Sequence, residues 1–263
     1  MSTLQLILPK TNTGNLVLVN ATHPLADCIP SELVAPDERY PGILMRREAA
    51  EALRAALSDI DAGGMIVPVS GYRSMSEQTQ IYNDSLRDNG EEFTRKYVAL
   101  PGCSEHQTGL AIDLGIFSDR IDFIRPDFPY SGICQKFRQV AADYGFVERY
   151  SADKQDVTEI AHEPWHFRYV GKENAAAVRA LGITFEEYIE YLRGFTPETK
   201  LLHVPSLSAA KPEDLGSAEF SALPDSGYVI YFVPTDENAG TESVNIPVPA
   251  QCGSYFISGS NDG

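Results

Sequence analysis

Two short blocks of the sequence carry the side chains of which hydrolytic metal sites are made. The first block runs from Ser104 to Asp113 and contains His106, and the second is Glu163-Pro-Trp-His166. Two imidazoles and one carboxylate can hold a metal ion such as zinc and leave a fourth coordination position open for water. The remaining carboxylate, Glu163, is a group that can act as a general base. The pattern therefore indicates metal-assisted hydrolysis.

A buried strand is expected to position the first block. Residues 110–116 are mostly apolar and Asp113 is their one charged residue, which predicts a strand buried on both faces. A carboxylate in such a strand is costly unless it is paired or bound to a metal. His106 lies upstream across Gly109, so its segment can fold back over the strand.

A second strand is expected to position the other block. Residues 165–170, Trp-His-Phe-Arg-Tyr-Val, predict this strand. On a regular strand Glu163 and His166 would face opposite sides, because side chains alternate. Pro164 can interrupt the alternation and let both side chains point into one site.

Taken singly, each of these residues has an ordinary structural explanation. One histidine is more often a hydrogen-bonded structural residue than a ligand, and Asp113 could pair with an arginine. Two imidazoles and two carboxylates in two short blocks, each beside an apolar strand, favour the metal site.

A third block, residues 70–78, places an arginine at the start of a helix. Ser74-x-x-Glu77 is a capping box and predicts a helix that runs toward Arg87. Arg73 then precedes the helix N-terminus, where a guanidinium beside free backbone N–H groups suits a carboxylate or a developing oxyanion. A surface salt bridge is the alternative role for Arg73.

Together the three blocks resemble the signature of the zinc-dependent D,D-peptidases of the VanY and VanXY type. The fold of this group is also similar to that of the hedgehog amino-terminal signalling domain. The resemblance spans roughly residues 1–195, and for the VanXY type it extends to four segments: Thr3-Leu-Gln-Leu, Asn20-Ala-Thr-His23-Pro-Leu, Ala99-Leu-Pro-Gly-Cys-Ser-Glu-His-Gln and Glu163-Pro-Trp-His-Phe-Arg-Tyr-Val-Gly. Motifs of this length are specific.

The resemblance implies a role for each candidate residue. His106, Asp113 and His166 would bind zinc, and Glu163 would be the catalytic base. Arg73 would stabilise the transition state. Substrate binding would fall to three further residues: Ser104, Gln78 and Trp165.

The reaction implied by the resemblance is hydrolysis of the terminal D-Ala-D-Ala bond of peptidoglycan precursors, in the free dipeptide or in the pentapeptide stem. Removing these targets would contribute to glycopeptide resistance. Two alternatives remain open: an exported L,D- or D,D-carboxypeptidase that trims mature wall stems, and a metal-stabilised binding module without turnover. Glu163 speaks against the second, since a structural metal site needs no general base.

Other candidate motifs are weaker. Ser151-Ala-Asp-Lys154 fits the Ser-x-x-Lys pattern of serine penicillin-binding enzymes, but the chain has neither Ser-Asp-Asn nor Lys-Thr-Gly to accompany it. The four cysteines show no metal-ligand spacing. His162 adjoins Glu163, but the family motif begins at Glu163, so His162 is not counted among the ligands.

Composition limits the partners of the chain. A net charge of −16 argues against nucleic acid and against an anionic membrane surface. No apolar run approaches the roughly 18 residues of a membrane span, and the N-terminus lacks the pattern of a secretory signal. Together with the unpatterned cysteines, these features predict a cytoplasmic protein that acts on a small peptide.

The order of expected elements predicts an α+β fold, a small central antiparallel sheet flanked by helices with a short C-terminal β appendage, because helices and strands do not alternate regularly. Helices are expected over residues 45–60, 74–87, 134–144, 173–181 and 185–192.

Composition also suggests where the chain divides. Residues 200–226 are rich in Pro, Ala, Ser and acidic residues, which predicts a linker. The catalytic domain would then comprise residues 1–199. Residues 227–263 would form a small β appendage with strands at 227–233, 244–248 and 254–258.

Overall fold

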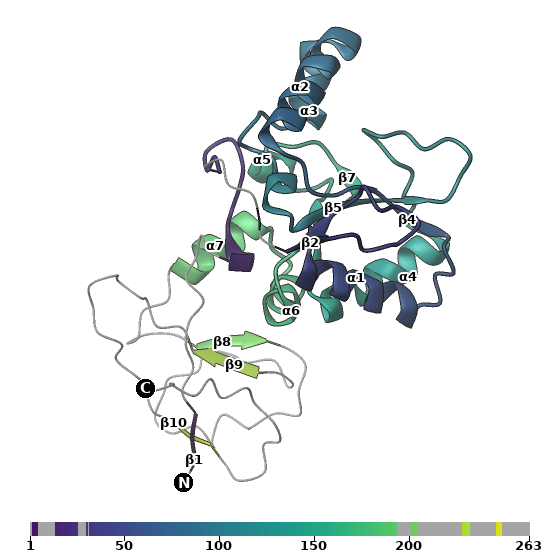
Figure 1. Cartoon of the computed structure of the whole chain (residues 1–263). Helices are drawn as coiled ribbons and strands as arrows, with labels where there is room; N and C mark the ends of the chain where they lie inside the picture. The colour runs from purple at the N-terminus through teal and green to yellow at the C-terminus, as the bar shows by residue number, and fades with distance from the viewer. Residues whose placement is uncertain are drawn as a thin grey trace. The chain divides into compact units, whose positions relative to one another are not determined.

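The computed structural model describes residues 2–4, 14–25, 30, 32–193, 201–204, 228–231 and 246–248. They fall into two compact units: Asn15–Tyr188, and a second unit made of Met1–Gly14 with Ile189–Gly263. Every candidate site residue named above lies in the first unit, whose elements are labelled in Figure 1 from β2 to α6.

A four-stranded antiparallel sheet forms the centre of this first unit. Its strands are β4 (Ile66–Ser70), β5 (Ala111–Ile116), β7 (Glu163–Tyr169) and β6 (Phe146–Tyr150), in that spatial order. The short strands β2 (Leu33–Val34) and β3 (Met45–Arg46) pair separately. The buried strand expected around Asp113 is β5, and the strand expected around His166 is β7. The α+β prediction is confirmed.

The helices that supply the core are α1 (Arg47–Asp59), α4 (Gly132–Ala141), η3 (Ala142–Tyr144) and α6 (Lys172–Leu181). α1 and α4 lie side by side in Figure 1, and α6 contacts η3 and β6. Buried residues of α1 recur at helical spacing, as in Ala49, Leu53 and Ala56. They join one core with Ile112 of β5 and Phe167 of β7. The helices predicted over 45–60, 134–144 and 173–181 are therefore confirmed.

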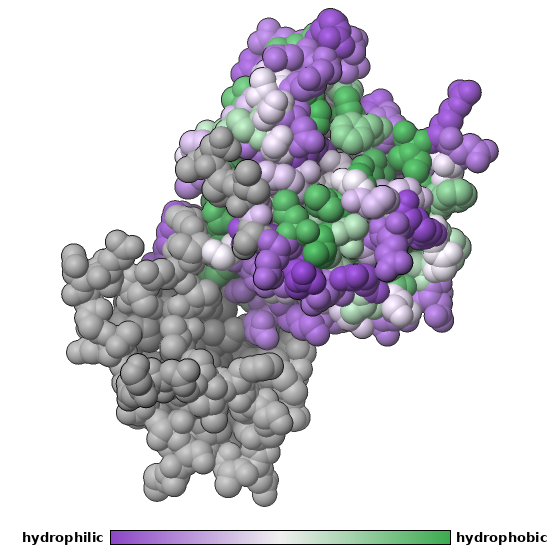
Figure 2. All heavy atoms as spheres, viewed as in Figure 1, coloured by the Kyte–Doolittle hydropathy of each residue, from purple (hydrophilic) through white to green (hydrophobic). Residues whose placement is uncertain are grey.

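A helical hairpin formed by α2 (Met75–Asn89) and α3 (Glu91–Tyr97) stands away from α1 and α4 in Figure 1. The predicted capping box is present: Ser74 Oγ accepts from the Glu77 N–H, and the Glu77 carboxylate accepts from the Ser74 N–H. Gly90, at φ +82°, separates the two helices. The outer part of the hairpin is predominantly hydrophilic on the face shown in Figure 2.

The remaining helical segments are η1 (Gly14–Leu16), η2 (Glu105–Thr108), α5 (Gln155–Thr158) and α7 (Phe185–Arg193). α7 begins with the predicted capping box, because Thr184 and Glu187 exchange hydrogen bonds of 2.7 and 3.1 Å. No helix among the residues that the structure describes is long and apolar enough to cross a bilayer.

The second unit contains two strand pairs, β8 (Leu201–Val204) with β9 (Tyr228–Tyr231), and β1 (Ser2–Leu4) with β10 (Ile246–Val248). β9 and β10 fall on predicted strands, whereas the strand predicted over 254–258 lies outside the described residues. β8 falls within the predicted linker 200–226, where Leu-Leu-His-Val pairs with a strand that is distant in sequence. The N-terminal strand belongs to this unit. The division into residues 1–199, 200–226 and 227–263 stays a prediction.

Candidate metal centre and substrate pocket

The sheet places two of the predicted ligands opposite each other. Asp113 of β5 and His166 of β7 are Cα partners in the strand ladder. Their neighbours Ile112 and Phe167 point into the helical core. Because side chains alternate along a strand, Asp113 and His166 therefore face the other side of the sheet. The register thus brings together two blocks that are fifty-three residues apart.

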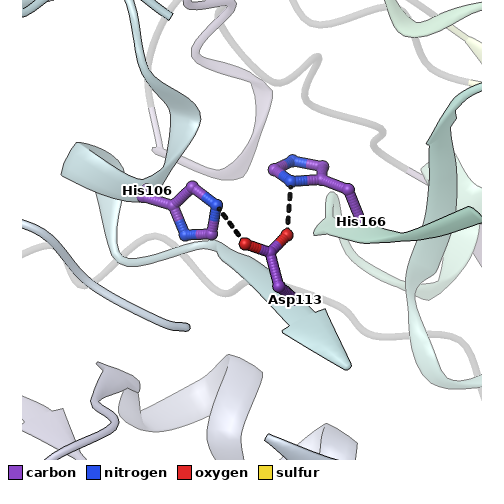
Figure 3. A group of neighbouring side chains, drawn as sticks. All are labelled: His106, Asp113 and His166. Carbon is purple, nitrogen blue, oxygen red and sulfur yellow. Dashed lines mark hydrogen bonds and ion pairs between the residues drawn. The ribbon is translucent and has the colours of Figure 1, made fainter. Parts of the chain in front are cut away.

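His106 completes the group from the single-turn helix η2, which precedes β5. Its Nε2 lies 3.2 Å from Oδ2 of Asp113, and Nδ1 of His166 lies 2.9 Å from Oδ1. Figure 3 shows both imidazoles directed at the one carboxylate. All three side chains are buried, and their ligand atoms lie within 4.8 Å of one another, close enough to hold one metal ion.

The far nitrogen of each imidazole faces an acceptor. Nδ1 of His106 lies 2.7 Å from the carbonyl oxygen of Gly71, so it must donate and leave Nε2 free. Nε2 of His166 lies 3.4 Å from a carboxylate oxygen of Glu105, which leaves Nδ1 for the metal. Metal-binding histidines are oriented by such contacts. Two imidazole nitrogens and a carboxylate fit a zinc ion.

Electrostatics differ between the two imidazoles. Burial, together with the charge of Arg73, lowers the pKa of His106 to about 4. Burial also opposes protonation of His166, but hydrogen bonds to Asp113 and Glu105 outweigh it and raise its pKa to about 9. Despite burial, the neighbouring imidazoles hold the pKa of Asp113 below its usual range. A metal bound here would displace the His166 proton at neutral pH.

Glu163 lies at the start of β7, beside the group. Its Oε2 is 3.8 Å from Nδ1 of His166. The register between β6 and β7 shifts between the pairs Glu148–Phe167 and Tyr150–Glu163, a stretch of β7 that contains Pro164. Glu163 and His166 both line one pocket. The predicted interruption of the alternation is therefore present. Burial raises the pKa of Glu163 to about 8.

Arg73 follows β4 and precedes α2, as predicted, but it makes a buried ion pair and no surface salt bridge. Its Nη2 donates to Oδ2 of Asp113 at 3.1 Å, and its Nε donates to Oγ of Ser70 at 2.8 Å. Burial lowers its pKa, against the pull of Asp113. Gln78 accepts from Nη1 at 3.3 Å and donates to the carbonyl of Ala99 at 2.8 Å. Both ends of the Gln78 amide are thus engaged behind Arg73.

The pocket over these residues combines polar and apolar walls. Ser104 and Trp165 line it, as does Tyr150 at the end of β6. None of their side-chain donors has a hydrogen-bond acceptor within the described residues. The apolar part of the pocket lining is formed by Ile81, Tyr97, Val98, Phe123, Ile124 and Ile160.

Sequence reasoning missed two residues of this site. Glu105 is buried next to His166, and its position directly before His106 was the available signal. Tyr150 ends a strand that had not been predicted. His162 is outside the metal-binding group, as expected, and its Nε2 lies 2.7 Å from the Tyr130 hydroxyl.

An α+β fold that holds a buried His–Asp–His group with a carboxyl group beside it defines a metal-dependent hydrolase. The chain belongs to the VanY family of D-alanyl-D-alanine carboxypeptidases, whose family model matches residues 42–172.

Characterised relatives are similar over most of the chain. The bifunctional D-Ala-D-Ala dipeptidase and carboxypeptidase VanXYC of Enterococcus gallinarum is 40% identical over 181 residues, 68% of this chain and 95% of the relative. The crystal structure of the vancomycin resistance D,D-dipeptidase VanXYg with a D-Ala-D-Ala phosphinate analogue is 47% identical, with a TM-score of 0.74 over 91% of this chain and 87% of that chain. A mutant of the D,D-pentapeptidase VanY from the VanB-type cassette, in complex with Zn(II), is 28% identical. Its TM-score is 0.56 over 66% of this chain and 98% of that chain.

Proposed function

We propose that this protein is a zinc-dependent peptidase that hydrolyses the terminal D-Ala-D-Ala bond of peptidoglycan precursors. The observation that carries the proposal is the His106–Asp113–His166 group with the buried carboxyl group of Glu163 beside it. The names of the relatives VanXYC and VanXYg support a substrate that ends in D-Ala-D-Ala. The free dipeptide, the pentapeptide stem, or both would be cleaved.

Three side chains are assigned to the metal. His106 through Nε2, His166 through Nδ1 and Asp113 through its carboxylate would hold zinc, the ion found with a VanY relative. When bound, zinc supplies a Lewis acid that polarises a carbonyl group and lowers the pKa of water.

Glu163 is assigned to proton transfer. Burial raises the pKa of Glu163 to about 8. Because a cation beside a carboxyl group lowers its pKa, a zinc ion here would bring the pKa of Glu163 closer to neutral pH, where the group can both take and return a proton. Its carboxylate would accept a proton from the attacking water. The same carboxyl group would then donate that proton to the amine of the departing D-alanine.

Arg73 is assigned to the negative charge that develops on the carbonyl oxygen. Its guanidinium lines the pocket and is held by Ser70, Gln78 and Asp113, so little reorganisation is needed when the charge appears. Gln78 would act through Arg73, because both ends of its amide are already engaged.

The hydroxyl groups of Ser104 and Tyr150 are assigned to the terminal carboxylate of the substrate. Both line the pocket and lack an acceptor within the described residues, and a carboxylate accepts strong hydrogen bonds from such donors. Trp165 would form part of the pocket wall. Hydrolysis of soluble precursors in the cytoplasm would remove the D-Ala-D-Ala ends to which glycopeptide antibiotics bind.

Release of free D-alanine tests the proposal. The zinc-loaded protein is incubated with the dipeptide D-Ala-D-Ala, with a pentapeptide stem ending in D-Ala-D-Ala and with a tetrapeptide stem ending in an L,D bond. We expect release from at least one of the first two, and loss of release after treatment with a chelator. Release from the tetrapeptide alone would favour the L,D-carboxypeptidase, and full zinc occupancy without any turnover would favour a binding module.

A further inference from the structure

Glu105 is a buried acidic residue next to the metal ligands, and its two carboxylate oxygens face different partners. Oε1 accepts a hydrogen bond from Nε of Arg149 at 2.9 Å and lies 3.1 Å from Nη1 of Arg168. Oε2 lies 3.4 Å from Nε2 of His166. No other group in the described part of the chain bonds to Oε2. One oxygen is thus held by arginines, and the other is left for the imidazole.

The charges around Glu105 balance without a contribution from His166. The side chains of Glu105, Arg149 and Arg168 have no exposed surface. Arg149 also forms two hydrogen bonds with Glu186, so two guanidiniums meet two carboxylates. Buried charges are tolerated when they are paired in this way. Glu105 is therefore an ionised acceptor, and His166 can remain a neutral ligand.

Strand β7 also connects Glu105 and His166, because it carries both His166 and the Arg168 that contacts Glu105. His166 and Arg168 are two residues apart on β7 and share one face of the strand, so the arginine that binds Glu105 moves with the ligand. Besides this ion pair, Arg168 donates hydrogen bonds to the carbonyl groups of Asn15 and Val17. Arg149 comes from the neighbouring strand β6. Two strands of the sheet therefore fix the carboxylate behind the imidazole.

We infer that Glu105 is a positioning residue that accepts the Nε2–H of His166 and so presents the Nδ1 lone pair to the metal. The inference rests on the proposed zinc site. An ionised acceptor fixes the tautomer and the ring orientation and makes the ligand nitrogen more basic. His106 provides an internal comparison, because its Nδ1 faces the neutral carbonyl group of Gly71.

Glu105→Gln removes the charge of the acceptor at almost unchanged volume. We expect the zinc Kd, measured by competition with a chelating dye, to rise about 10- to 100-fold. ¹⁵N spectra of the parent protein loaded with zinc should show His166 protonated at Nε2 and bound through Nδ1, and this pattern should be lost or mixed in the variant. Asp143→Asn removes an exposed ion pair with Arg179 and is the matched control, with a parental Kd.

Glu105→Asp tests the same inference if the Glu105→Gln protein does not fold. It retains the negative charge for Arg149 and Arg168 but draws the oxygen away from His166, so the zinc Kd should still rise. A folded variant of either kind with a parental zinc Kd and parental His166 nitrogen shifts would overturn the inference, whatever its Tm. These measurements use no substrate. A protein that binds zinc through this arrangement but cleaves no D-Ala-D-Ala would refute the proposed function alone.

Discussion

The two sides of the pocket are built in different ways. The metal side, defined by Asp113, His166 and Glu163, lies on paired strands of the central sheet, and all three side chains are buried. The outer wall, defined by Tyr97 and Phe123, comes from α3 and from the segment between β5 and α4, and Phe123 is 45% exposed. The fold therefore holds the residues proposed for catalysis more firmly than the residues that shape the rest of the pocket.

The two sides also differ in the free energy that the loss of one contact would cost. On the metal side, the Asp113 carboxylate contacts both imidazoles and Arg73. The loss of one member of such a buried group leaves a charge unpaired, which costs several kcal/mol. On the outer wall, the Phe123 ring lies 5.4 Å from the Arg73 guanidinium. A partly exposed contact of this type contributes about 0.5–1 kcal/mol. Substitutions on the two sides should therefore have different consequences.

The largest effect is expected from a ligand of the metal side. Asp113→Ala removes one of three proposed ligands and also the partner of Arg73, so zinc content and D-alanine release should fall together, release by at least about 10³-fold. Elemental analysis and a D-alanine assay measure both. His162→Ala is the control and should keep stoichiometric zinc. An Asp113→Ala protein with full zinc and activity would remove Asp113 from the site.

Arg73→Lys should have the next largest effect while leaving zinc in place. A lysine cannot donate at once to Ser70, Gln78 and Asp113, and it lacks the planar fork of the guanidinium. We expect kcat and kcat/KM to fall alike, by about 10²-fold, because the interaction is made with the transition state. Steady-state kinetics check this. A rise in KM alone would place Arg73 in ground-state binding.

Tyr150→Phe tests whether the Tyr150 hydroxyl group binds the substrate without affecting the metal side. It removes one hydroxyl group without opening a cavity, so zinc affinity should stay parental. A lost hydrogen bond to a charged group corresponds to about a tenfold rise in KM. The measurement is KM for the dipeptide, beside the zinc Kd of the same protein. Unchanged kinetics would mean that the hydroxyl does not touch the substrate.

Phe123→Ala should give the smallest effect, and only on selectivity. Loss of an apolar wall residue should change the ratio of kcat/KM for dipeptide and pentapeptide by about tenfold or less, with zinc affinity unchanged. A variant that loses zinc would show that the outer wall and the metal side are not separable.

Local signals predicted much of this structure. The capping boxes at Ser74 and Thr184, the buried strand around Asp113 and the interruption at Pro164 each depend on a few adjacent residues, and all are present. The grouping of His106, Asp113 and His166 was predicted because two histidines and a buried aspartate lay in two short motifs.

Contacts between distant segments could not be predicted in this way. The register that sets Asp113 against His166, and the arginines that hold Glu105, join positions 44 to 63 residues apart. Gln78 was assigned to the substrate by the resemblance, and that assignment stays a prediction; the contacts of its amide with Arg73 and with the carbonyl group of Ala99 were not visible in the sequence. The pairing of β1 with β10 joins opposite ends of the chain for the same reason.

The central claim is that the metal side carries out hydrolysis with Glu163 as its proton carrier. The most direct test is Glu163→Gln, measured for zinc content and for kcat on D-Ala-D-Ala in the same preparation. We predict stoichiometric zinc with kcat reduced about 10²- to 10⁴-fold, as expected when a general base is lost. A variant with full zinc and near-parental kcat would contradict the claim.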